Sequence, residues 1–172
     1  MSRQGDSAAA TVAMTIGAVK FLCDGMLTRL GRFLRAAGYD TEIAGPGEHD
    51  GALLARAIHE DRLLLTCDRE LAQRRAAEGR VIVLPSNGLD RTARALDAAV
   101  PIDWFRAPFT RCLVDNSPLR PATPEERDRL PTRAREIGDD DIFTCSQCSR
   151  VYWPGSHVRR IRQRLAEWSR SK

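Results

Sequence analysis

The sequence lacks any long hydrophobic stretch, and this absence limits the classes of protein to which it can belong. No segment of the 172 residues approaches the run of about 18 apolar residues that a membrane-spanning helix needs, so no membrane span is expected. Met1 to Thr15 also lacks a basic segment followed by a long apolar run, so no signal peptide is predicted. We interpret residues 1–16 as a disordered N-terminal tail.

Cysteine and lysine are both scarce. The five cysteines are an odd number in a chain without a recognisable secretory signal. This favours a reducing compartment, with thiols free or on a metal, and we expect a cytoplasmic protein. Lysine occurs only at Lys20 and Lys172, so nearly every basic residue is an arginine. Genomic base composition can cause this bias, so the choice of arginine itself is no evidence for phosphate binding.

The net charge of +4 comes from the second part of the chain. Basic and acidic residues cancel between residues 17 and 107, whereas Arg150 to Lys172 holds seven basic residues against Glu167 alone. A basic end beside an acidic site is typical of a nucleic-acid footprint, although a solvated helix face is the simpler explanation of the charge alone. The hydrophobic content of 42% is enough for one ordinary domain with a small appendage.

Short apolar runs alternate with helical patterns up to residue 99, and this order predicts a parallel sheet with right-handed crossovers. After Pro101 the periodicity disappears, and prolines punctuate a polar stretch that is predicted to form a second, smaller unit with little core. A helical pattern with an apolar stripe and opposing arginines follows it. The predicted strands are 19–23, 41–44, 63–66 and 81–84, and the predicted helices begin near residues 26, 50, 68 and 89.

Three aspartates stand where predicted strands end or helices begin. Asp24 follows the first strand, Asp50 opens a helix, and Asp68 comes two residues after Thr66. Ligands of a parallel α/β sheet collect at the carboxyl ends of its strands, and carboxylates gathered there need a cation between them. Oxygen-only ligation suits Mg²⁺ or Mn²⁺, which handle phosphates. The pattern favours a metal-dependent nuclease, with Thr66 adding a hydroxyl, although each aspartate alone also suits a turn or an N-cap.

Cys145 and Cys148 form a Cys-x-x-Cys pair that suits zinc. A structural site wants four ligands, so we expect Cys112 and Asp115 as the upstream pair of a zinc ribbon, with His157 as the alternative to Asp115. An unmetallated pair, a redox pair and a disulfide are the other interpretations. A unit with so few apolar residues needs an additional source of stability, which favours a bound metal over the other three interpretations.

The remaining candidates are less specific. Strand alternation is expected to turn Cys23 and Cys67 into the core. Asn87 and Asp90 are candidates for a fourth active-site ligand or a water contact, and both also suit a turn before a helix. Trp153 either stacks on a base or packs the ribbon, and Ser156 can cap the last helix; His49 and His59 receive no role.

Four strings of the sequence are distinctive when taken together. They are Phe-Leu-Cys-Asp-Gly-Met-Leu-Thr-Arg-Leu-Gly-Arg-Phe-Leu-Arg-Ala-Ala-Gly-Tyr-Asp (21–40), Leu-Leu-Leu-Thr-Cys-Asp-Arg-Glu-Leu (63–71), Phe-Thr-Arg-Cys (109–112) and Cys-Ser-Gln-Cys…Tyr-Trp-Pro-Gly-Ser-His (145–157). In this combination they resemble the Mut-seven C-terminal ribonuclease family. The resemblance covers about residues 19 to 168. The family pattern has two Cys-x-x-Cys knuckles, and here Asp115 stands in place of the second cysteine of the first knuckle.

The resemblance implies a PIN-like α/β nuclease domain over residues 17–106, with a zinc-ribbon unit and a basic C-terminal helix over residues 107–172. It implies hydrolysis of single-stranded RNA, with Asp24, Asp50 and Asp68 holding Mg²⁺ or Mn²⁺. His157, Arg159 and Arg160 are the residues expected to bind the nucleic acid. The rival interpretations are an RNA- or protein-binding adaptor that has lost catalysis and a redox protein that uses Cys145 and Cys148.

Overall fold

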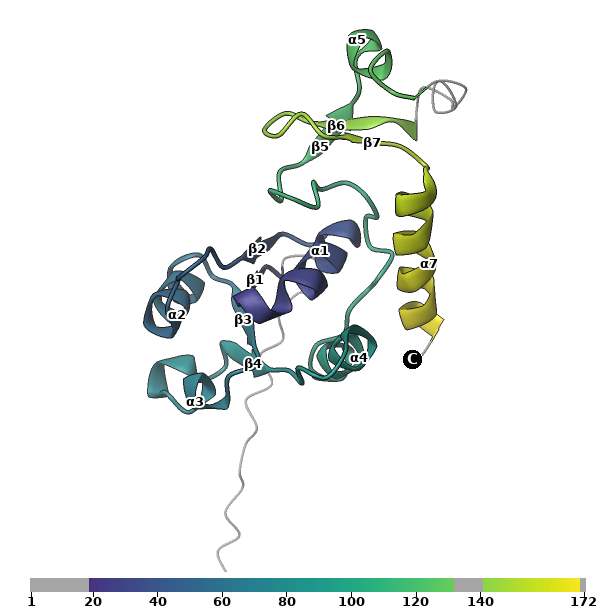
Figure 1. The fold of residues 1–172 in the computed structure, drawn as a ribbon. Coiled ribbons are helices and arrows are strands. Elements are labelled where there is room, and N and C mark those ends of the chain that lie inside the picture. Colours follow the sequence, from purple (N-terminus) through teal and green to yellow (C-terminus); the bar gives the residue numbers. More distant parts are fainter. Residues whose placement is uncertain (1–18, 132–140, 171–172) are drawn as a thin grey trace, which may run out of the picture.

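The computed structural model describes residues 19–131 and 141–170, and the predicted tail at residues 1–16 lies outside them. A four-stranded sheet with helices on both faces forms the main body, and a three-stranded sheet lies at one end of it (Figure 1). The elements in chain order are β1 (Phe21–Cys23), the 3-10 helix η1 (Gly25–Leu27), α1 (Thr28–Ala36), β2 (Thr41–Ile43), α2 (Asp50–His59), β3 (Leu63–Thr66), α3 (Arg69–Ala72), the 3-10 helix η2 (Arg75–Ala77), β4 (Val81–Val83), α4 (Leu89–Ala99), β5 (Leu119–Pro121), α5 (Pro124–Arg127), β6 (Phe143–Cys145), β7 (Val151–Tyr152) and α7 (Ser156–Arg170).

The larger sheet is parallel throughout, in the order β2-β1-β3-β4. In the central pair Phe21 lies opposite Leu63 and Cys23 opposite Leu65. Every residue of β1 and β3 is buried, because helices cover both faces of these two central strands. This is why the two strands appear in the sequence as continuous apolar runs rather than as alternating patterns. The predicted α/β fold with a parallel sheet is confirmed.

Successive residues of the central strands supply two separate cores. Phe21, Cys23 and Leu65 pack with α1 and α4 on one face. Leu22 and Leu64 pack on the other face, with α2 and the segment around α3. This alternation follows from the two-residue period of a strand. It confirms that Cys23 is a core residue, because its side chain is fully buried beside Gly31 of α1.

The predicted helix after Asp68 is shorter than its apolar pattern indicated. The structure has only the single turn of α3 there, followed by the separate turn η2. The helix predicted from Met26 is divided in a similar way, into η1 and α1, and it ends as predicted at Gly38, which has a φ of +95°. Gly38 allows the chain to turn sharply towards β2, because residues with a side chain rarely adopt this conformation.

The small sheet is antiparallel, in the order β5-β6-β7. Among the residues that the structure describes, its own buried core consists of Ala122, Leu130 and Ile142, with Val151 and Trp153 packed against them. Trp153 therefore packs against the core of the small sheet, which is one of the two roles that the sequence predicted for it. A core of this size stabilises a sheet weakly, so the ribbon depends on other interactions.

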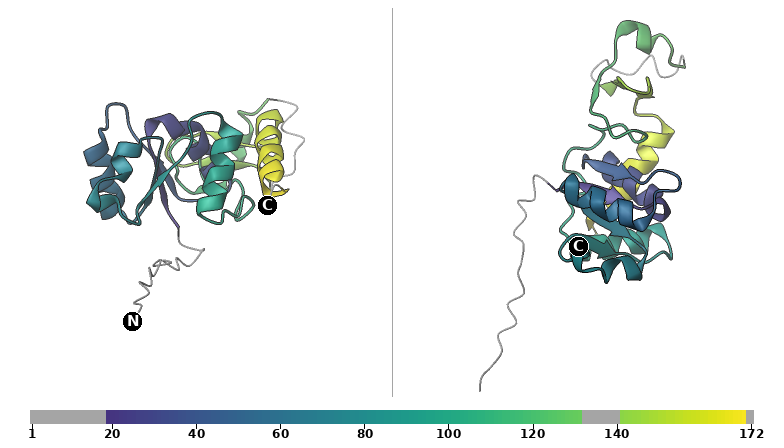
Figure 2. Two further views of the ribbon diagram at one scale, coloured as in Figure 1. Left: turned by 90° about the horizontal axis from the view of Figure 1, so that it is seen from below. Right: turned by 90° about the vertical axis from the view of Figure 1, so that its left-hand side faces the viewer.

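The C-terminal helix α7 returns from the small sheet to the main body, where it lies beside α4 (Figures 1 and 2). Leu165 and Trp168 are buried in the same core as β1 and β3, and the Trp168 ring lies 4.7 Å from that of Trp104 between centroids. Phe109 and Leu113 also belong to this core. The main core thus continues past residue 106, across the predicted boundary between the two units.

Candidate functional site: a metal-ligand cluster and an acidic sheet edge

The side chains of Cys112, Asp115, Cys145 and Cys148 converge at the junction between the small sheet and the main body. One ligand atom from each lies within 4.8 Å of all the others. The Sγ atoms of Cys112 and Cys148 are 3.6 Å apart, and Cys145 Sγ lies 3.1 Å from an oxygen of Asp115. The exposed His157 is not part of this group, so Asp115 is the fourth member.

Two chain segments present these ligands with the same backbone geometry. In the first knuckle, the amide of Asn116 donates to the carbonyl of Cys112, and the amide of Cys112 donates to the carbonyl of Ser117. The second knuckle repeats both bonds, from Ser149 to Cys145 and from Cys145 to Arg150.

The residue after each knuckle has a positive φ, +71° at Asn116 and +56° at Ser149. The carboxylate of Asp115 therefore occupies the position that the Cys148 thiol holds in the other knuckle.

The first knuckle is fixed to the main body by buried polar side chains. The guanidinium of Arg35, on α1, donates to the carbonyls of Leu113 and Val114 at 3.2 and 2.7 Å. The side-chain oxygen of Asn116 accepts a hydrogen bond from the amide of Thr41 in β2 at 3.0 Å. The second knuckle belongs to the small sheet. A bound ion would therefore link the two sheets.

The four ligands do not all carry negative charge in the absence of a cation. Burial opposes ionisation of Cys112, but a hydrogen bond from the Tyr152 hydroxyl at 3.1 Å helps to hold the pKa of that thiol below its usual range. Burial likewise opposes ionisation of Asp115, but a hydrogen bond from Cys148 holds the pKa of its carboxyl low. Burial, together with a hydrogen bond to Asp115, raises the pKa of Cys148 to about 12.

This donor set can hold a metal ion. Three sulfurs and one carboxylate oxygen match the ligand types and the ligand count of a closed zinc site. A cation placed among them would favour the thiolates and release protons from Cys145 and Cys148. The redox interpretation required Cys145 and Cys148 to stand at a strand–helix junction, whereas Cys145 ends β6 and a turn leads to β7.

The second candidate region is the edge of the parallel sheet at which its strands end. Asp24 follows β1 there, and its side chain is 9% exposed. One carboxylate oxygen, Oδ1, accepts hydrogen bonds from the amides of Met26 and Leu27 at 2.9 and 3.1 Å. The other, Oδ2, accepts from the amide of Cys67 at 2.9 Å. Asp24 thus ties the end of β1 to the end of β3, and its side chain cannot rotate freely.

Asp68 and Asp50 lie at the starts of the next two helices at this edge. The hydroxyl oxygen of the buried Thr66 accepts a hydrogen bond from the Asp68 amide at 3.0 Å, and Asp68 Oδ1 caps α3 by accepting from Glu70 at 2.7 Å. Asp50 is the first residue of α2, and the N-cap is His49, whose Nδ1 accepts from Ala52 at 3.2 Å. Sequence reasoning gave His49 no role.

The three aspartates lie at one edge but do not form a compact group. Among the residues that the structure describes, only the Cys112 cluster brings three or more potential ligand atoms within 4.8 Å of one another. The carboxylates of Asp24, Asp50 and Asp68 are therefore more widely spaced than the four ligands of that cluster. The acidic edge is an open arrangement, and backbone amides fix its Asp24 and Asp68 carboxylates by hydrogen bonds.

A protein-family model provides the decisive comparison. The model described as the Mut7-C RNAse domain matches residues 19–165.

The chain belongs to the Mut7-C RNAse domain family.

The match covers both the sheet with the acidic edge and the four-ligand cluster, so the two regions belong to one family architecture. No curated protein and no solved structure matches the chain.

Several predicted residues have other contacts in this Mut7-C RNAse domain. Asp90 was a candidate fourth ligand at the acidic edge, but both of its oxygens accept hydrogen bonds from Arg164 of α7, at 2.6 and 2.7 Å. The Trp168 indole also donates to Asp90, at 2.8 Å. These bonds hold the pKa of the Asp90 carboxyl below its usual range, with the Arg164 bond as the main cause. Asp90 thus anchors α7 to α4.

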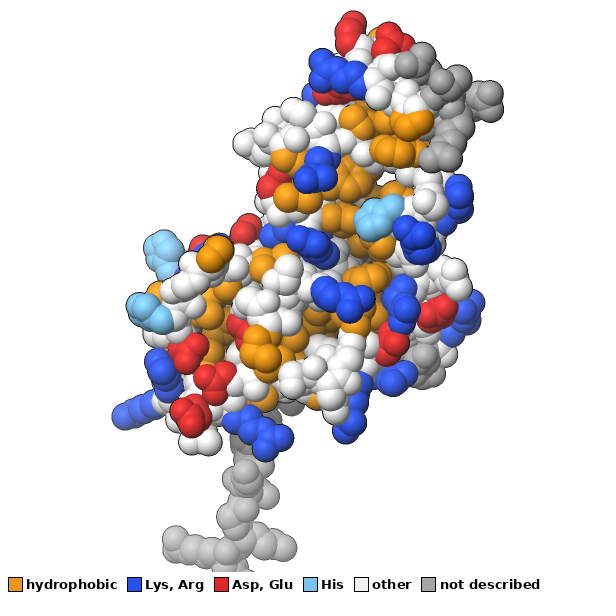
Figure 3. Space-filling model, viewed as in Figure 1, with side chains coloured by type: hydrophobic (Ala, Val, Ile, Leu, Met, Phe, Trp, Pro, Cys, Tyr) orange, Lys and Arg blue, Asp and Glu red, His pale blue; other side chains and the backbone are white. Residues whose placement is uncertain are grey.

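The proposed nucleic-acid ligands lie at the exposed start of α7. His157, Arg159 and Arg160 all face solvent, and Arg159 also donates a hydrogen bond to the Pro154 carbonyl at 2.7 Å. Arginine side chains are visible where α7 faces the main body (Figure 3). The structure has no helix long and apolar enough to cross a membrane within its described residues.

Sequence reasoning missed the residues that position the metal ligands. The first knuckle is contacted by Arg35 and Tyr152, and Asn116 ties it to Thr41 of β2. These partners lie far apart in the sequence, and Arg35 and Tyr152 belong to ordinary helix and strand patterns. The prediction that Cys67 turns into the core was also wrong in part. Cys67 lies beyond the end of β3, where strand alternation no longer holds, and it is half-buried beside an open pocket.

Proposed function

We propose that this Mut7-C RNAse domain is a metal-dependent ribonuclease that hydrolyses phosphodiester bonds of single-stranded RNA at the acidic edge of its parallel sheet. The family match over residues 19–165 is the observation that carries the proposal. The buried, backbone-tethered carboxylate of Asp24 supports it, because catalytic groups must be held on rigid elements. The odd number of cysteines supports a cytoplasmic location.

Asp24, Asp50 and Asp68 are the proposed ligands of Mg²⁺ or Mn²⁺. Each carboxylate oxygen can accept more than one hydrogen bond or metal contact, so the three amide bonds on Asp24 leave acceptor capacity for an ion. Mg²⁺ is usually bound by one or two carboxylates and keeps several waters. The spacing of the three aspartates therefore suits direct contact by some of them and contact through water by the rest. When bound, the ion would activate water and stabilise the charge that develops on the phosphate.

Thr66 acts by positioning Asp68. Thr66 accepts from the Asp68 amide and so fixes the turn that presents this carboxylate. Asp68 in turn caps α3 with Oδ1. Both interactions exist before RNA arrives, so no reorganisation is needed when the phosphate binds.

The cluster of Cys112, Asp115, Cys145 and Cys148 is the proposed structural zinc site. A closed set of four protein ligands has no open position for substrate, so its role is to hold the ribbon against the main body. The ribbon and α7 would then place His157, Arg159 and Arg160 against the RNA backbone. Because such contacts release counterions, RNA binding should weaken steeply as salt rises.

The open spacing of the acidic edge supports a second candidate, an RNA- or protein-binding adaptor without catalysis. Cleavage of labelled single-stranded RNA by the full chain separates the two functions. The ribonuclease proposal predicts cleavage with Mg²⁺ or Mn²⁺. If the parent protein binds RNA but cleaves none with either ion, the adaptor is supported and the ribonuclease is rejected.

Asp68→Asn is the sharpest variant for this assay. Asparagine caps a helix as well as aspartate does, so α3 should keep its N-cap while the charge that holds the ion is lost. Asp24→Asn is less clean, because its amide group would face the donating amide of Cys67 and destabilise the fold. The matched control is Asp61→Asn, which removes an exposed carboxylate paired with Arg80 away from the edge.

A further inference from the structure

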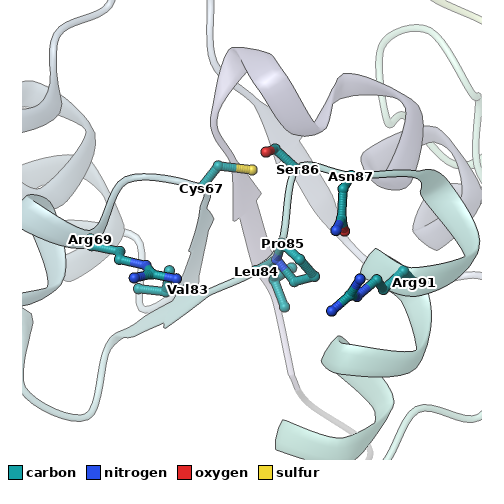
Figure 4. Close-up of a pocket in the computed structure, with 8 residues that line it drawn as sticks. All are labelled: Cys67, Arg69, Val83, Leu84, Pro85, Ser86, Asn87 and Arg91. Carbon is teal, nitrogen blue, oxygen red and sulfur yellow. The ribbon is translucent and has the colours of Figure 1, made fainter.

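An open pocket of about 440 Å³ lies beside the acidic edge, where β3 and β4 end (Figure 4). Cys67 and Arg69 line it from the end of β3, the chain from Val83 to Asn87 lines it from the end of β4, and Arg91 lines it from α4. Figure 4 shows Arg69 and Arg91 on opposite sides of the opening, with the Cys67 sulfur towards Ser86. The pocket involves none of the four ligands of the cysteine cluster.

Two unpaired guanidinium groups flank this pocket. Arg69 and Arg91 are both exposed, and neither has an ion pair or a side-chain hydrogen bond among the contacts of the described residues. Other arginines of the domain, such as Arg56 and Arg62, are held by carboxylates. Unpaired arginines facing one cavity favour an anionic ligand with several acceptor oxygens, such as a phosphate.

The start of α4 adds further donors on the Arg91 side. Gly88 is the N-cap and supplies no side-chain hydrogen bond, so the first amides of the helix lack a side-chain partner. Asp90 in this turn would repel a phosphate, but Arg164 neutralises it. The hydroxyl of Thr92 donates to the carbonyls of Pro85 and Gly88 at 2.7 and 2.9 Å, which fixes the loop that carries Ser86 and Asn87. This end of the pocket is therefore preorganised for an anion.

The opposite wall has an apolar part. Val83 is 37% exposed although it ends a strand, and Pro85 and Cys67 extend the same wall. Ser86 and Asn87 supply hydrogen-bonding groups beside it. Apolar surface with a few polar groups and two cations matches the parts of a nucleotide, and the volume is in the range of pockets for small ligands, roughly 300–1,000 Å³.

The pocket adjoins the proposed reaction site through Cys67. The thiol of this residue lines the pocket, and its backbone amide donates to Asp24 Oδ2 at 2.9 Å. We propose that this pocket binds the nucleotide next to the scissile phosphate of a single-stranded RNA, with its phosphate between Arg69 and Arg91. This inference rests on the proposed function, because the acidic edge is where the scissile phosphate is proposed to lie.

The test measures RNA affinity separately from cleavage. The test variant is the double substitution Arg69→Ala/Arg91→Ala. Its control, Arg75→Ala/Arg129→Ala, loses the same charge at two exposed arginines that do not line the pocket. Fluorescence anisotropy with a labelled oligo(U), on the zinc-loaded protein without added Mg²⁺ or Mn²⁺ and at several salt concentrations, gives the dissociation constants. We expect about a tenfold or greater loss of affinity in the pocket variant only. Its salt dependence should also fall by about 0.7 in log–log slope, since the loss of one phosphate contact on a single strand contributes about 0.7.

The outcomes distinguish this inference from the proposed function. Equal affinities for the pocket variant and the control overturn the nucleotide pocket, whether or not the parent cleaves RNA. An unmodified chain that binds no oligo(U) overturns it as well. If the parent binds RNA through Arg69 and Arg91 but cleaves none with Mg²⁺ or Mn²⁺, the pocket is retained as an RNA site and the ribonuclease proposal fails.

Alkylation of Cys67 provides a measurement that does not depend on arginine substitution. Cys23 is fully buried and the other three cysteines belong to the metal-ligand cluster, so Cys67 is the thiol that excess N-ethylmaleimide should reach in the zinc-loaded protein. Saturating oligo(U) should slow its modification, as measured by mass spectrometry. Unchanged modification of Cys67 while RNA is bound would contradict occupation of the pocket.

Discussion

The cysteine cluster and the acidic edge use carboxylates in opposite ways. Asp115 belongs to a closed group of four ligand atoms within 4.8 Å of one another, at the junction of two sheets. Asp24 is fixed by three backbone amides, but it stands on an open edge where no such group forms within the described residues. A closed site suits an ion that holds structure, and an open one suits an ion that needs room for water and substrate.

Zinc removal should have the largest effect, because the described part of the ribbon has a core of only three buried hydrophobic residues. Cys145→Ser should lose the ion and unfold the ribbon, since structural zinc sites contribute about 10 kcal/mol. Elemental analysis and thermal unfolding measure both results. Cys67→Ser, outside the cluster, should keep about one zinc per chain. Parent protein purified without zinc, with a melting temperature that a chelator leaves unchanged, would refute a structural role for the cluster.

Loss of a carboxylate at the open edge should abolish chemistry while leaving the fold intact. Asp68→Asn should reduce RNA cleavage by at least about 100-fold, because even outer-shell changes at metal sites cost 10- to 100-fold. Its thermal unfolding should match that of the parent, since asparagine retains the α3 cap. Asp61→Asn should cleave at the parent rate. Equal cleavage by Asp68→Asn and Asp61→Asn would remove Asp68 from the site.

A fourth cysteine ligand in the cysteine cluster should increase its affinity for zinc without changing the chemistry of the acidic edge. Asp115→Cys places a fourth thiolate on the first knuckle, and softer ligands suit zinc better than carboxylate does. Zinc should transfer to a chromophoric chelator more slowly from this variant than from the parent. The rate of RNA cleavage should stay the same. Faster zinc loss would show that the Asp115 position cannot serve as a ligand position.

The anchor between α7 and α4 should give the smallest effect. Arg164→Gln removes the ion pair with Asp90, which is partly exposed, so the cost at neutral pH should be below about 1 kcal/mol. The pKa of Asp90 is lower in the folded protein, so this stabilisation is present above the unfolded pKa of about 4 and is lost as pH falls below it. Chemical denaturation at pH 7 and pH 3 measures the difference. Arg160→Gln, on the exposed face of the same helix, is the control, and a difference that grows at low pH would contradict the pairing.

The sequence predicted the elements whose burial pattern is local. Leu63 to Thr66 was predicted as a strand and is one, because both of its faces are covered and its first three residues are leucines. The helix from Leu89 to Ala99 has the predicted bounds. Strand β5 was not predicted, since it lies in a polar, proline-punctuated stretch and its pairing with β6 depends on residues far along the chain.

The candidate site was predictable in part for the same reason. The spacing from Cys112 to Asp115 repeats that of Cys145 to Cys148, and spacing is visible in a sequence. By contrast, the bond from Arg35 to the first knuckle and the bond from Arg164 to Asp90 join residues more than 70 positions apart. Neither Arg35 nor Arg164 lies in a local sequence pattern that distinguishes it from an ordinary surface arginine. The open spacing of the three aspartates also depends on side-chain directions that no strand or helix pattern specifies.

Anomalous diffraction at the zinc and manganese absorption edges, from crystals of the full chain grown with both ions, tests the central contrast most directly. We predict zinc among Cys112, Asp115, Cys145 and Cys148, and manganese in contact with Asp24 or Asp68 at the open edge. Zinc in the cluster with no manganese at either aspartate, even with a non-cleavable RNA bound, would contradict the proposal that this edge performs the chemistry.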